Sequence, residues 1–255
     1  MKYSHFLITR FNLPLVWTKD KNNVSTQTEE WLHHRFELFK HYCFPSVANQ
    51  TSKDFIWMLL FYDGTPEKYK KMNEELEKKH PFYKPCYLND EQSNHLVEYI
   101  NNYIADYIEA DTEYIITTRM DNDDAIAIEF MEEVEKFAKE QATTMGYVIN
   151  LIHGIQYYPK YNVSMSVNCK NSHFTSYVEP KGGYIRTIYG CGDHSKVSKN
   201  YAIYNIRNKE TMWMEVCHER NVANDPHLKW AFNPLFKSFE EERFAVEPRG
   251  GGVTA

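Results

Sequence analysis

Four consecutive positions carry the strongest chemical signal in the sequence: Asp121, Asn122, Asp123 and Asp124 follow a β-forming run at 114–118. Carboxylates crowded at the end of a buried strand repel one another and lose hydration, so a cation is needed to hold them together. Oxygen ligands suit Mg²⁺, Mn²⁺ and Ca²⁺, and Mg²⁺ keeps positions open for substrate phosphates. The glycine that an EF-hand loop needs for its sharp turn is missing after Asp121. The cluster therefore predicts a divalent metal site open to a phosphate.

A plainer interpretation of the same residues is a solvated acidic turn. A helix is expected over 125–140, and carboxylates favour the positive end of a helix. Asp124 then stands where an N-cap side chain accepts a hydrogen bond from the first helical turn. For Asp124 alone, capping is the favoured role.

The first half of the chain alternates short apolar runs with amphipathic segments, which predicts strand and helix units and a largely parallel, covered sheet. The run at 55–61 is continuously apolar, as in a strand buried on both faces. The expected strands are 5–10, 55–61, 81–88 and 114–118, and the expected helices cover 29–42, a stretch ending near 79, 91–108 and 125–140. Ligands collect at the carboxyl ends of strands in α/β sheets, which is where the acidic cluster is expected.

The second half of the chain is less regular. Beyond Gly146 it has β-leaning stretches at 147–158, 163–167, 184–189 and 201–206, separated by Gly, Asn and Lys loops. No repeat, linker or composition break divides the chain. We therefore expect a single domain over 1–248, followed by a Gly-rich tail, 249–255, that is expected to be disordered.

Composition excludes several classes of protein. The 255 residues carry a formal charge of -6 with a pI near 6.0, which gives no general attraction to nucleic acid or to an anionic membrane. The five cysteines form no Cys-x-x-Cys pair. Neither a signal peptide nor an apolar stretch of about 18 residues is visible. A cytoplasmic location is expected, with peripheral association with the inner membrane if the acceptor is linked to lipid.

Several blocks of the sequence resemble one known family. The segment from Tyr114 to Asp124 resembles the strand and Asp-x-Asp motif of nucleotide-sugar glycosyltransferases with the GT-A fold. More specifically, the chain is similar to the rhamnosyltransferase family over about 5–224. The further blocks that carry this similarity are Phe6 to Asn12, Arg35 to Phe39, Tyr42 to Val47, Gln50 with Thr51, Phe55 to Trp57, and Trp213 to His218.

The resemblance implies a GT-A-like (Rossmann-like) α/β fold of the nucleotide-diphospho-sugar transferase type, with a central mostly parallel sheet flanked by helices. It assigns 1–124 to a nucleotide-binding half and 125–248 to an acceptor-binding half. It also assigns Thr9, Arg10 and Phe11 to the nucleotide wall, with Arg10 able to pair with a phosphate or simply with a neighbouring helix.

Further nucleotide and metal contacts follow from the same resemblance. Asp63 occupies the place of an acidic residue near the base or ribose, although Asp63 with Gly64 also reads as a turn. Asp123 is expected to coordinate the metal directly, and Asp121 to contact the ribose or the metal through water. Arg119 shares a strand face with Asp121 and is expected to support the diphosphate or to neutralise the carboxylates.

The second half is expected to complete the site. His218 and His194 compete as a further metal ligand, with His218 ranked first, although a single histidine is more often a hydrogen-bonded core or loop residue. An imidazole ligand favours Mn²⁺ over Mg²⁺. Glu179 and Asp193 are the candidates for the catalytic base that deprotonates the acceptor hydroxyl, with Glu179 ranked first.

Aromatic residues offer surfaces on which a sugar could stack. Those singled out in the second half are Tyr157, Tyr158, Tyr184 and Tyr189.

The resulting hypothesis is a metal-dependent glycosyltransferase that uses Mn²⁺ or Mg²⁺ and a dTDP- or UDP-sugar. Its acceptor would be a glycan or a lipid-linked glycan in polysaccharide biosynthesis, and rhamnose is the sugar that the family name indicates. Two other functions remain open. One is a nucleotidyltransferase or phosphohydrolase with the same Asp-bound metal, which the absence of a Walker loop disfavours. The other is a non-catalytic carbohydrate-binding protein.

Overall fold

The central sheet has seven strands in the order β10-β6-β9-β4-β1-β2-β3. The computed structural model describes residues 2–14, 18–20, 25–141, 143–194, 196–219, 236–237 and 241–246. In sheet order the strands are Ala202–Ile206, Tyr147–Leu151, Thr175–Pro180, Tyr114–Arg119, Tyr3–Arg10, Ile56–Tyr62 and Tyr83–Leu88. Neighbouring strands are parallel except β9, which runs antiparallel to both β4 and β6. The expected α/β class with a central, mostly parallel sheet is confirmed.

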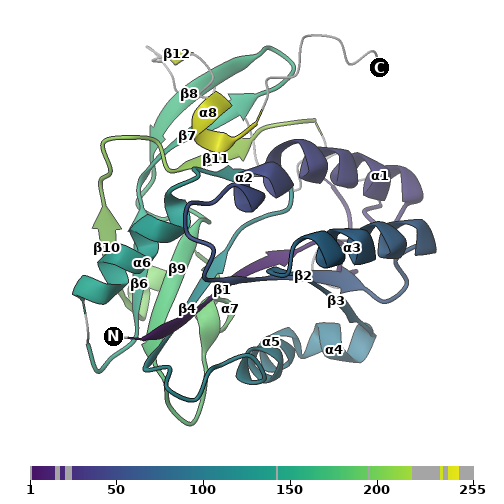
Figure 1. Cartoon of the computed structure of the whole chain (residues 1–255). Helices are drawn as coiled ribbons and strands as arrows, with labels where there is room; N and C mark the ends of the chain where they lie inside the picture. Colours follow the sequence, from purple (N-terminus) through teal and green to yellow (C-terminus); the bar gives the residue numbers. More distant parts are fainter. Residues whose placement is uncertain are drawn as a thin grey trace.

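Helices cover both faces of this sheet (Figure 1). The helices α1, α2 and α3 lie on one side of β1 to β3, and α4, α5 and α7 lie on the other. The helix bounds are α1 Glu29–Leu38, α2 Phe44–Ala48, α3 Glu67–Lys79, α4 Asp90–Asn94, α5 Leu96–Ala105, α6 Phe130–Glu140, α7 Thr187–Gly190 and α8 Glu241–Phe244. No helix in the described ranges combines the length and the apolar character needed to span a membrane.

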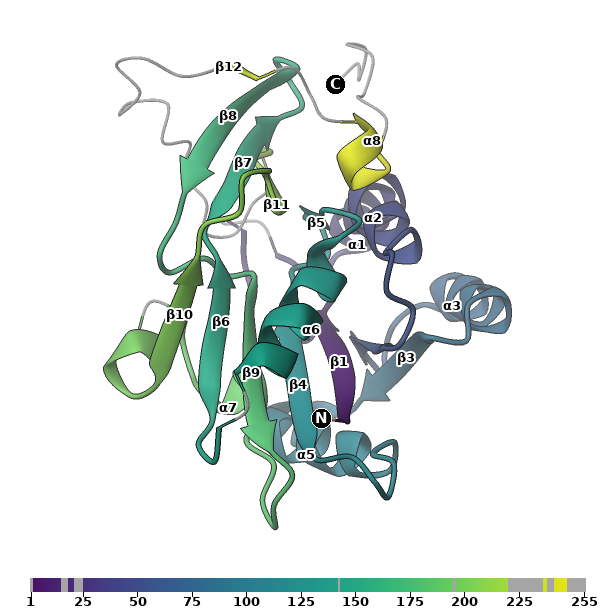
Figure 2. The same cartoon turned by 60° about the vertical axis from the view of Figure 1, so that its left-hand side comes forward.

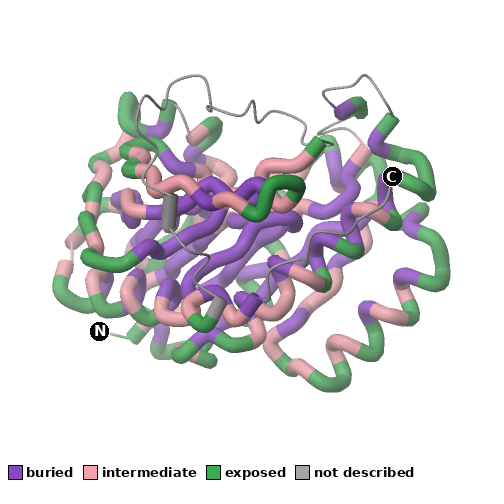
Figure 3. The backbone as a smooth tube through the Cα atoms, turned by 90° about the horizontal axis from the view of Figure 1, so that it is seen from above, coloured by how far each residue is buried: buried purple, intermediate pink, exposed green. Residues whose placement is uncertain are grey.

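The alternation of side chains along β1 divides the core between the two faces. Leu7 and Phe11 join the cluster beneath α1, whereas Phe6 and Ile8 join the cluster beneath α5. The first cluster is strongly aromatic: the Phe11 ring lies 4.4 Å from that of Phe36, measured between centroids. Viewed from above, the buried residues lie along the central strands and the exposed ones on the outer helices and turns (Figure 3).

A smaller sheet stands beside the first one (Figure 2). Its strand order is β12-β8-β7-β11-β5, with bounds Phe236–Lys237, Val163–Asn168, His153–Tyr158, Trp213–Val216 and Ala125–Ile126. A glycine fixes the packing of β7 against β11, because a Cβ on Gly154 would lie 2.1 Å from the Trp213 indole. On its other side β11 pairs with β5, which directly follows the acidic cluster.

The structure corrects the expected helices in the first half. The helix expected over 29–42 ends as α1 at Leu38 and continues through a π-helical turn, Phe39–Cys43, into α2. Pro45 lies in the first turn of α2, directly after the π-helical turn. The segment 91–108 contains the end of α4 and the whole of α5, with His95 between them.

The second half also differs from expectation. The helix expected from residue 125 begins only at Phe130, after β5 and a turn. The stretch 147–158 contains two strands of different sheets, and the stretch 184–189 contains the start of α7 in place of a strand. The tail at 249–255 lies outside the described residues.

Candidate active site

The acidic cluster lies at the carboxyl ends of β1 and β4. These strands are parallel neighbours, with Ile8 paired to Arg119, so the chain leaves both at the same edge of the sheet. Asn122 is buried, and its Nδ2 donates to the carbonyls of Arg10 at 3.2 Å and Phe11 at 3.0 Å. Asn122 therefore fastens the cluster to the end of β1.

Asp124 does not cap a helix, so that prediction was wrong. The N-cap of α6 is Glu129, five residues further on. The Asp124 Oδ2 lies 2.8 Å from His173 Nε2, and its Oδ1 accepts the backbone N–H of Val216 at 2.9 Å. Asp124 thus joins the end of β4 to the start of β9 and to β11.

Asp121, Asp124 and His173 form a candidate metal site. Each offers one ligand atom, and these three atoms all lie within 4.8 Å of one another. Burial raises the pKa of Asp124 to about 7, and the nearby charge of Asp123 adds to the shift. A buried carboxylate pushed this far from its ordinary pKa is stabilised by a cation. Two oxygens and an imidazole nitrogen suit Mn²⁺, so the residues present fit a divalent ion.

His173 escaped the prediction from sequence. Burial lowers its pKa, but the hydrogen bond and charge of Asp124 outweigh burial and raise it to about 9, so a metal ion would have to displace the proton of His173. Only the antiparallel register of β4 and β9 shows why His173 lies there. Thr118 pairs with Ser176, and continuing this register by three residues places His173 opposite Asp121. That register could not be read from the sequence, because β9 is reached only after an excursion through the smaller sheet.

Asp123 is the centre of a buried ion network. Its Oδ2 accepts from Arg35 Nη1 at 2.5 Å and lies 2.9 Å from His218 Nε2. Burial raises the pKa of Asp123, but the charge of Arg35 and the hydrogen bond of His218 outweigh burial and hold it well below its usual value. The structure brings Asp123 and His218 into contact. However, these contacts engage Asp123 with two side chains, and direct metal coordination by either residue stays a prediction.

Two guanidinium groups lie beside the cluster. The Arg10 guanidinium carbon is 5.4 Å from the centre of the Tyr189 ring. Arg119 donates from Nε to the carbonyl of His173 at 3.1 Å and from Nη1 to that of Gly192 at 3.4 Å. Arg10 Nε and Arg119 Nη2 are buried and have no hydrogen-bond partner within the described part of the chain.

The charges of these groups depend on one another. Burial lowers the pKa of Arg119, and the charge of Arg10 adds to that effect, while Tyr189 and Asp121 partly offset it. For Arg10, burial also lowers the pKa, but Tyr189 and Asp121 outweigh it and the net shift is upward. Asp121 therefore interacts with the positive charges of Arg10 and Arg119 and with the carboxylate of Asp124.

The loop after α7 brings Asp193 and His194 to the same place. The His194 ring lies 6.1 Å from the His173 ring, and its Nδ1 is 3.8 Å from Asp193 Oδ1. Burial lowers the pKa of His194, and the charges of Arg119 and His173 lower it further. An unprotonated imidazole next to the metal candidates is suited to ligation.

The structure does not bring Glu179 to the cluster. Glu179 pairs with Ile115, six residues before Asp121, which is roughly 15–20 Å along a strand. Both of its carboxylate oxygens accept backbone N–H groups, from Arg186 and Thr187. Its ranking above Asp193 as catalytic base is therefore not supported by this arrangement.

The remaining predicted residues have other surroundings. Thr9 is fully buried, and its hydroxyl accepts the indole N–H of Trp57 at 3.0 Å. Phe11 is buried in the aromatic core, and Asp63 is exposed at the end of β2. Contacts of these residues with a nucleotide stay predictions.

Of the four tyrosines singled out for sugar stacking, only Tyr189 lies against the site, beside Arg10. Tyr157 and Tyr158 are buried, and Tyr184 is exposed on the loop before α7.

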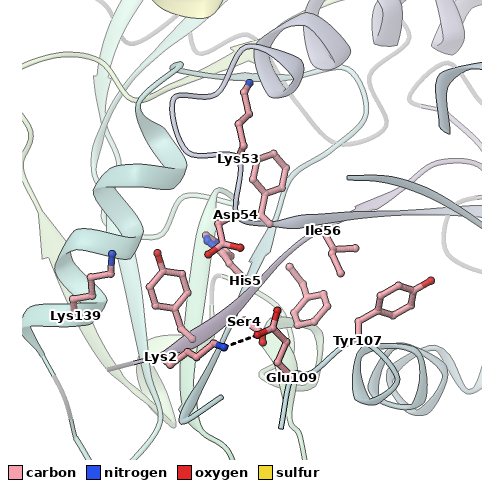
Figure 4. Close-up of a pocket in the computed structure, with 12 residues that line it drawn as sticks. Lys2, Ser4, His5, Lys53, Asp54, Ile56, Tyr107, Glu109 and Lys139 are labelled. Atoms are coloured by element: carbon pink, nitrogen blue, oxygen red, sulfur yellow. Dashed lines mark ion pairs between the residues drawn. The ribbon is translucent and has the colours of Figure 1, made fainter. Parts of the chain in front are cut away.

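A separate hollow of about 470 Å³ lies at the opposite edge of the sheet (Figure 4). It opens at the amino end of β1, where Lys2 and Glu109 form an ion pair of 2.6 Å. Lys53, Asp54 and Lys139 also line it. The acidic cluster contributes no residue to this hollow, so it is not part of the candidate active site.

The sequence matches a glycosyltransferase family. The family described as "Putative rhamnosyl transferase" matches residues 4–229. The chain belongs to this family. It has a mixed α/β core with a seven-stranded, mostly parallel central sheet. No curated protein matches the sequence.

Solved structures show a distant likeness. S. aureus TarS has a TM-score of 0.42 and 13% identity, with 85% of this chain and 37% of the TarS chain covered. A "putative nucleotide-diphospho-sugar transferase" from Desulfovibrio desulfuricans G20 has a TM-score of 0.39 and 9% identity, covering 87% of this chain and 84% of the other. Mouse xyloside xylosyltransferase 1 has a TM-score of 0.30 and 12% identity, covering 59% and 54%. The chain thus spans little more than a third of TarS.

Proposed function

We propose that the chain is a metal-dependent glycosyltransferase that takes a sugar from a nucleoside-diphosphate donor, with UDP- and dTDP-sugars as the first donors to test. The observation that carries this proposal is the set of three ligand atoms, from Asp121, Asp124 and His173, within 4.8 Å of one another at the carboxyl edge of the sheet. Membership of the rhamnosyl transferase family supports rhamnose as the transferred sugar. The acceptor is a glycan, free or linked to lipid, in polysaccharide biosynthesis.

The divalent ion is assigned to Asp121, Asp124 and His173, with His194 as a further ligand. When bound, such an ion supplies positive charge that neutralises the departing nucleoside diphosphate. Asp124 also accepts the Val216 N–H, so its carboxylate is held in place by the backbone of β11. That contact limits the reorganisation needed when substrate arrives.

The diphosphate is assigned to Arg10 and Arg119. Both guanidinium groups lie beside Asp121, and each keeps a buried nitrogen that makes no hydrogen bond to any described residue. Guanidinium groups donate to phosphate oxygens in a fixed planar geometry, which positions the sugar as well as binding the charge. The pair therefore orients the donor for attack on its anomeric carbon.

The catalytic base is assigned to Asp193. An inverting transfer needs a carboxylate that takes the proton of the acceptor hydroxyl as the new bond forms. The side chain of Asp193 is 58% exposed and lies next to His194 at the edge of the cluster. An acceptor from solvent can reach it there, whereas Glu179 is buried away from the cluster.

A panel of sugar nucleotides tests the proposal directly. The native chain is incubated with UDP-, dTDP- and GDP-sugars, with Mn²⁺ or with EDTA, and release of the nucleoside diphosphate is measured. We expect release from at least one donor with Mn²⁺ and none with EDTA. Release of pyrophosphate from a nucleoside triphosphate, with no activity on any sugar nucleotide, would contradict the proposal.

A further inference from the structure

A short segment from Arg186 to Gly192 runs over the sheet face toward the acidic cluster. It contains α7, a single helical turn, and its side chains pack against β4 and β9. Near its start, Thr187 has φ = 63°, in the left-handed region that a β-branched residue rarely adopts. A strained backbone persists only where its surroundings fix it.

Three successive backbone N–H groups are held by side chains of the sheet. The carboxylate of Glu179 accepts from Arg186 at 2.9 Å and from Thr187 at 2.9 Å. The hydroxyl of Thr117 accepts from Ile188 at 2.8 Å. Glu179 is 6% exposed, so its bonds are formed away from bulk water. These contacts determine where the segment starts.

The other end of the segment reaches both guanidinium groups. Tyr189 lies beside Arg10, and its hydroxyl donates to the carbonyl of Ile8 at 3.5 Å. Gly192, with φ = 85°, accepts from Arg119 Nη1 through its carbonyl. A shift of the segment at Glu179 would therefore move the contacts of Arg10 and of Arg119 together.

We propose that Glu179 is a positioning residue, which acts through the strained turn at Thr187 to place Tyr189 against Arg10 and Gly192 against Arg119. The proposal rests on the assigned role of the two arginines in holding the diphosphate. It gives Glu179 a function other than proton transfer, and it makes the segment 186–192 the support of the diphosphate site.

The test compares Glu179→Ala with a matched control, Glu135→Gln. Glu135 is also a buried carboxylate in a hydrogen-bond network, since it accepts from Ser52 Oγ at 2.8 Å and from Tyr3 OH at 3.0 Å. It contacts neither the segment nor the arginines through any of these bonds. Two measurements are made on each purified variant: hydrogen exchange of the amides at 186–192 without ligand, and calorimetric affinity for UDP and dTDP with Mn²⁺.

We expect Glu179→Ala to speed hydrogen exchange across 186–192 and to weaken nucleoside diphosphate binding between about tenfold and a hundredfold. This range corresponds to the loss of one charge-assisted hydrogen bond from an arginine to the diphosphate. The control should leave both readouts at the native level. Adding Thr187→Gly to Glu179→Ala should restore much of the affinity, because glycine adopts the left-handed conformation without strain.

Each outcome decides between the two claims. Unchanged exchange in Glu179→Ala, or faster exchange with native affinity, would overturn the positioning role and leave the proposed function intact. An equal loss of affinity in the control would also overturn it, since the effect would then be general destabilisation. If the native chain binds neither nucleotide, the proposed function fails, and the positioning role fails with it.

Discussion

Replacing Asp123 by Ala is expected to destabilise the protein far more than replacing Asp121, although each change removes one carboxylate from the same cluster. The Asp123 side chain is 5% exposed, and its partner Arg35 is 9% exposed. Asp123→Ala would leave the guanidinium of Arg35 buried without its carboxylate. Asp121 is half-buried; it repels Asp124 but attracts Arg10 and Arg119, so its loss removes unfavourable and favourable interactions that largely offset one another.

The magnitude follows from the burial of the pair. Removing one partner of a buried ion pair costs about 3–5 kcal/mol. For a chain of this size, that loss corresponds to roughly 6–20 °C in melting temperature. Asp121→Ala is expected to change the free energy of unfolding by less than about 0.5 kcal/mol, as for a substitution outside the core.

Thermal and urea denaturation in EDTA, followed by circular dichroism, measures both variants without a metal contribution. The matched control is the double variant Asp123→Leu with Arg35→Met. It replaces the buried pair by apolar side chains and should recover most of the lost stability. Equal stability of Asp121→Ala and Asp123→Ala in EDTA would refute the assignment of Asp123 to the ion pair.

Three further predictions concern residues away from the metal site. Thr9→Val should lower the free energy of unfolding by about 1–3 kcal/mol, because it leaves the indole N–H of Trp57 buried without an acceptor. The nucleotide affinity of this variant should stay native. Weaker nucleotide binding in calorimetry would show instead that Thr9 contacts the nucleotide. Gly154→Ala should lower the free energy of unfolding, measured by urea denaturation, by about 1–3 kcal/mol, because the new methyl group would overlap the Trp213 ring. An unchanged free energy of unfolding would contradict the close packing of β7 on β11. Burial raises the pKa of Glu135, but the hydrogen bonds that Glu135 accepts outweigh burial, and the net shift is downward. The carboxylate of Glu135 therefore contributes to the free energy of unfolding above a pH of about 4.5, and this contribution is lost as the pH falls through the pKa of the folded state. Glu135→Gln should make the stability curve flatter below that pH, and a slope as steep as that of the native chain would contradict this.

The sheet and its ligand edge could be predicted from the sequence, because they depend on local patterns. The continuous apolar run at 55–61 became the buried strand β2, and the run at 114–118 became β4, which ends at the acidic cluster. Asp121 could be assigned to the site on chemistry alone. The prediction depended on residue type and on position after a strand, and neither depends on contacts with distant parts of the chain.

The partners of the carboxylates could not be predicted, because they are set by contacts across large separations in the chain. Arg35 reaches Asp123 from 88 positions away, and His173 reaches Asp124 from 49. The position of Glu179 could not be predicted for the same reason, because the antiparallel register of β9 places it away from the cluster.

Calorimetric titration of the native chain with UDP and dTDP, in Mn²⁺ and in EDTA, tests the central claim most directly when it is repeated with His173→Ala. We expect binding of at least one nucleotide in Mn²⁺, and a loss of at least about tenfold in EDTA and in His173→Ala, since even losing a residue that supports a metal ligand weakens metal binding by about 10–100-fold. Binding that is equally tight in EDTA, or native affinity in His173→Ala, would contradict the metal site formed by Asp121, Asp124 and His173.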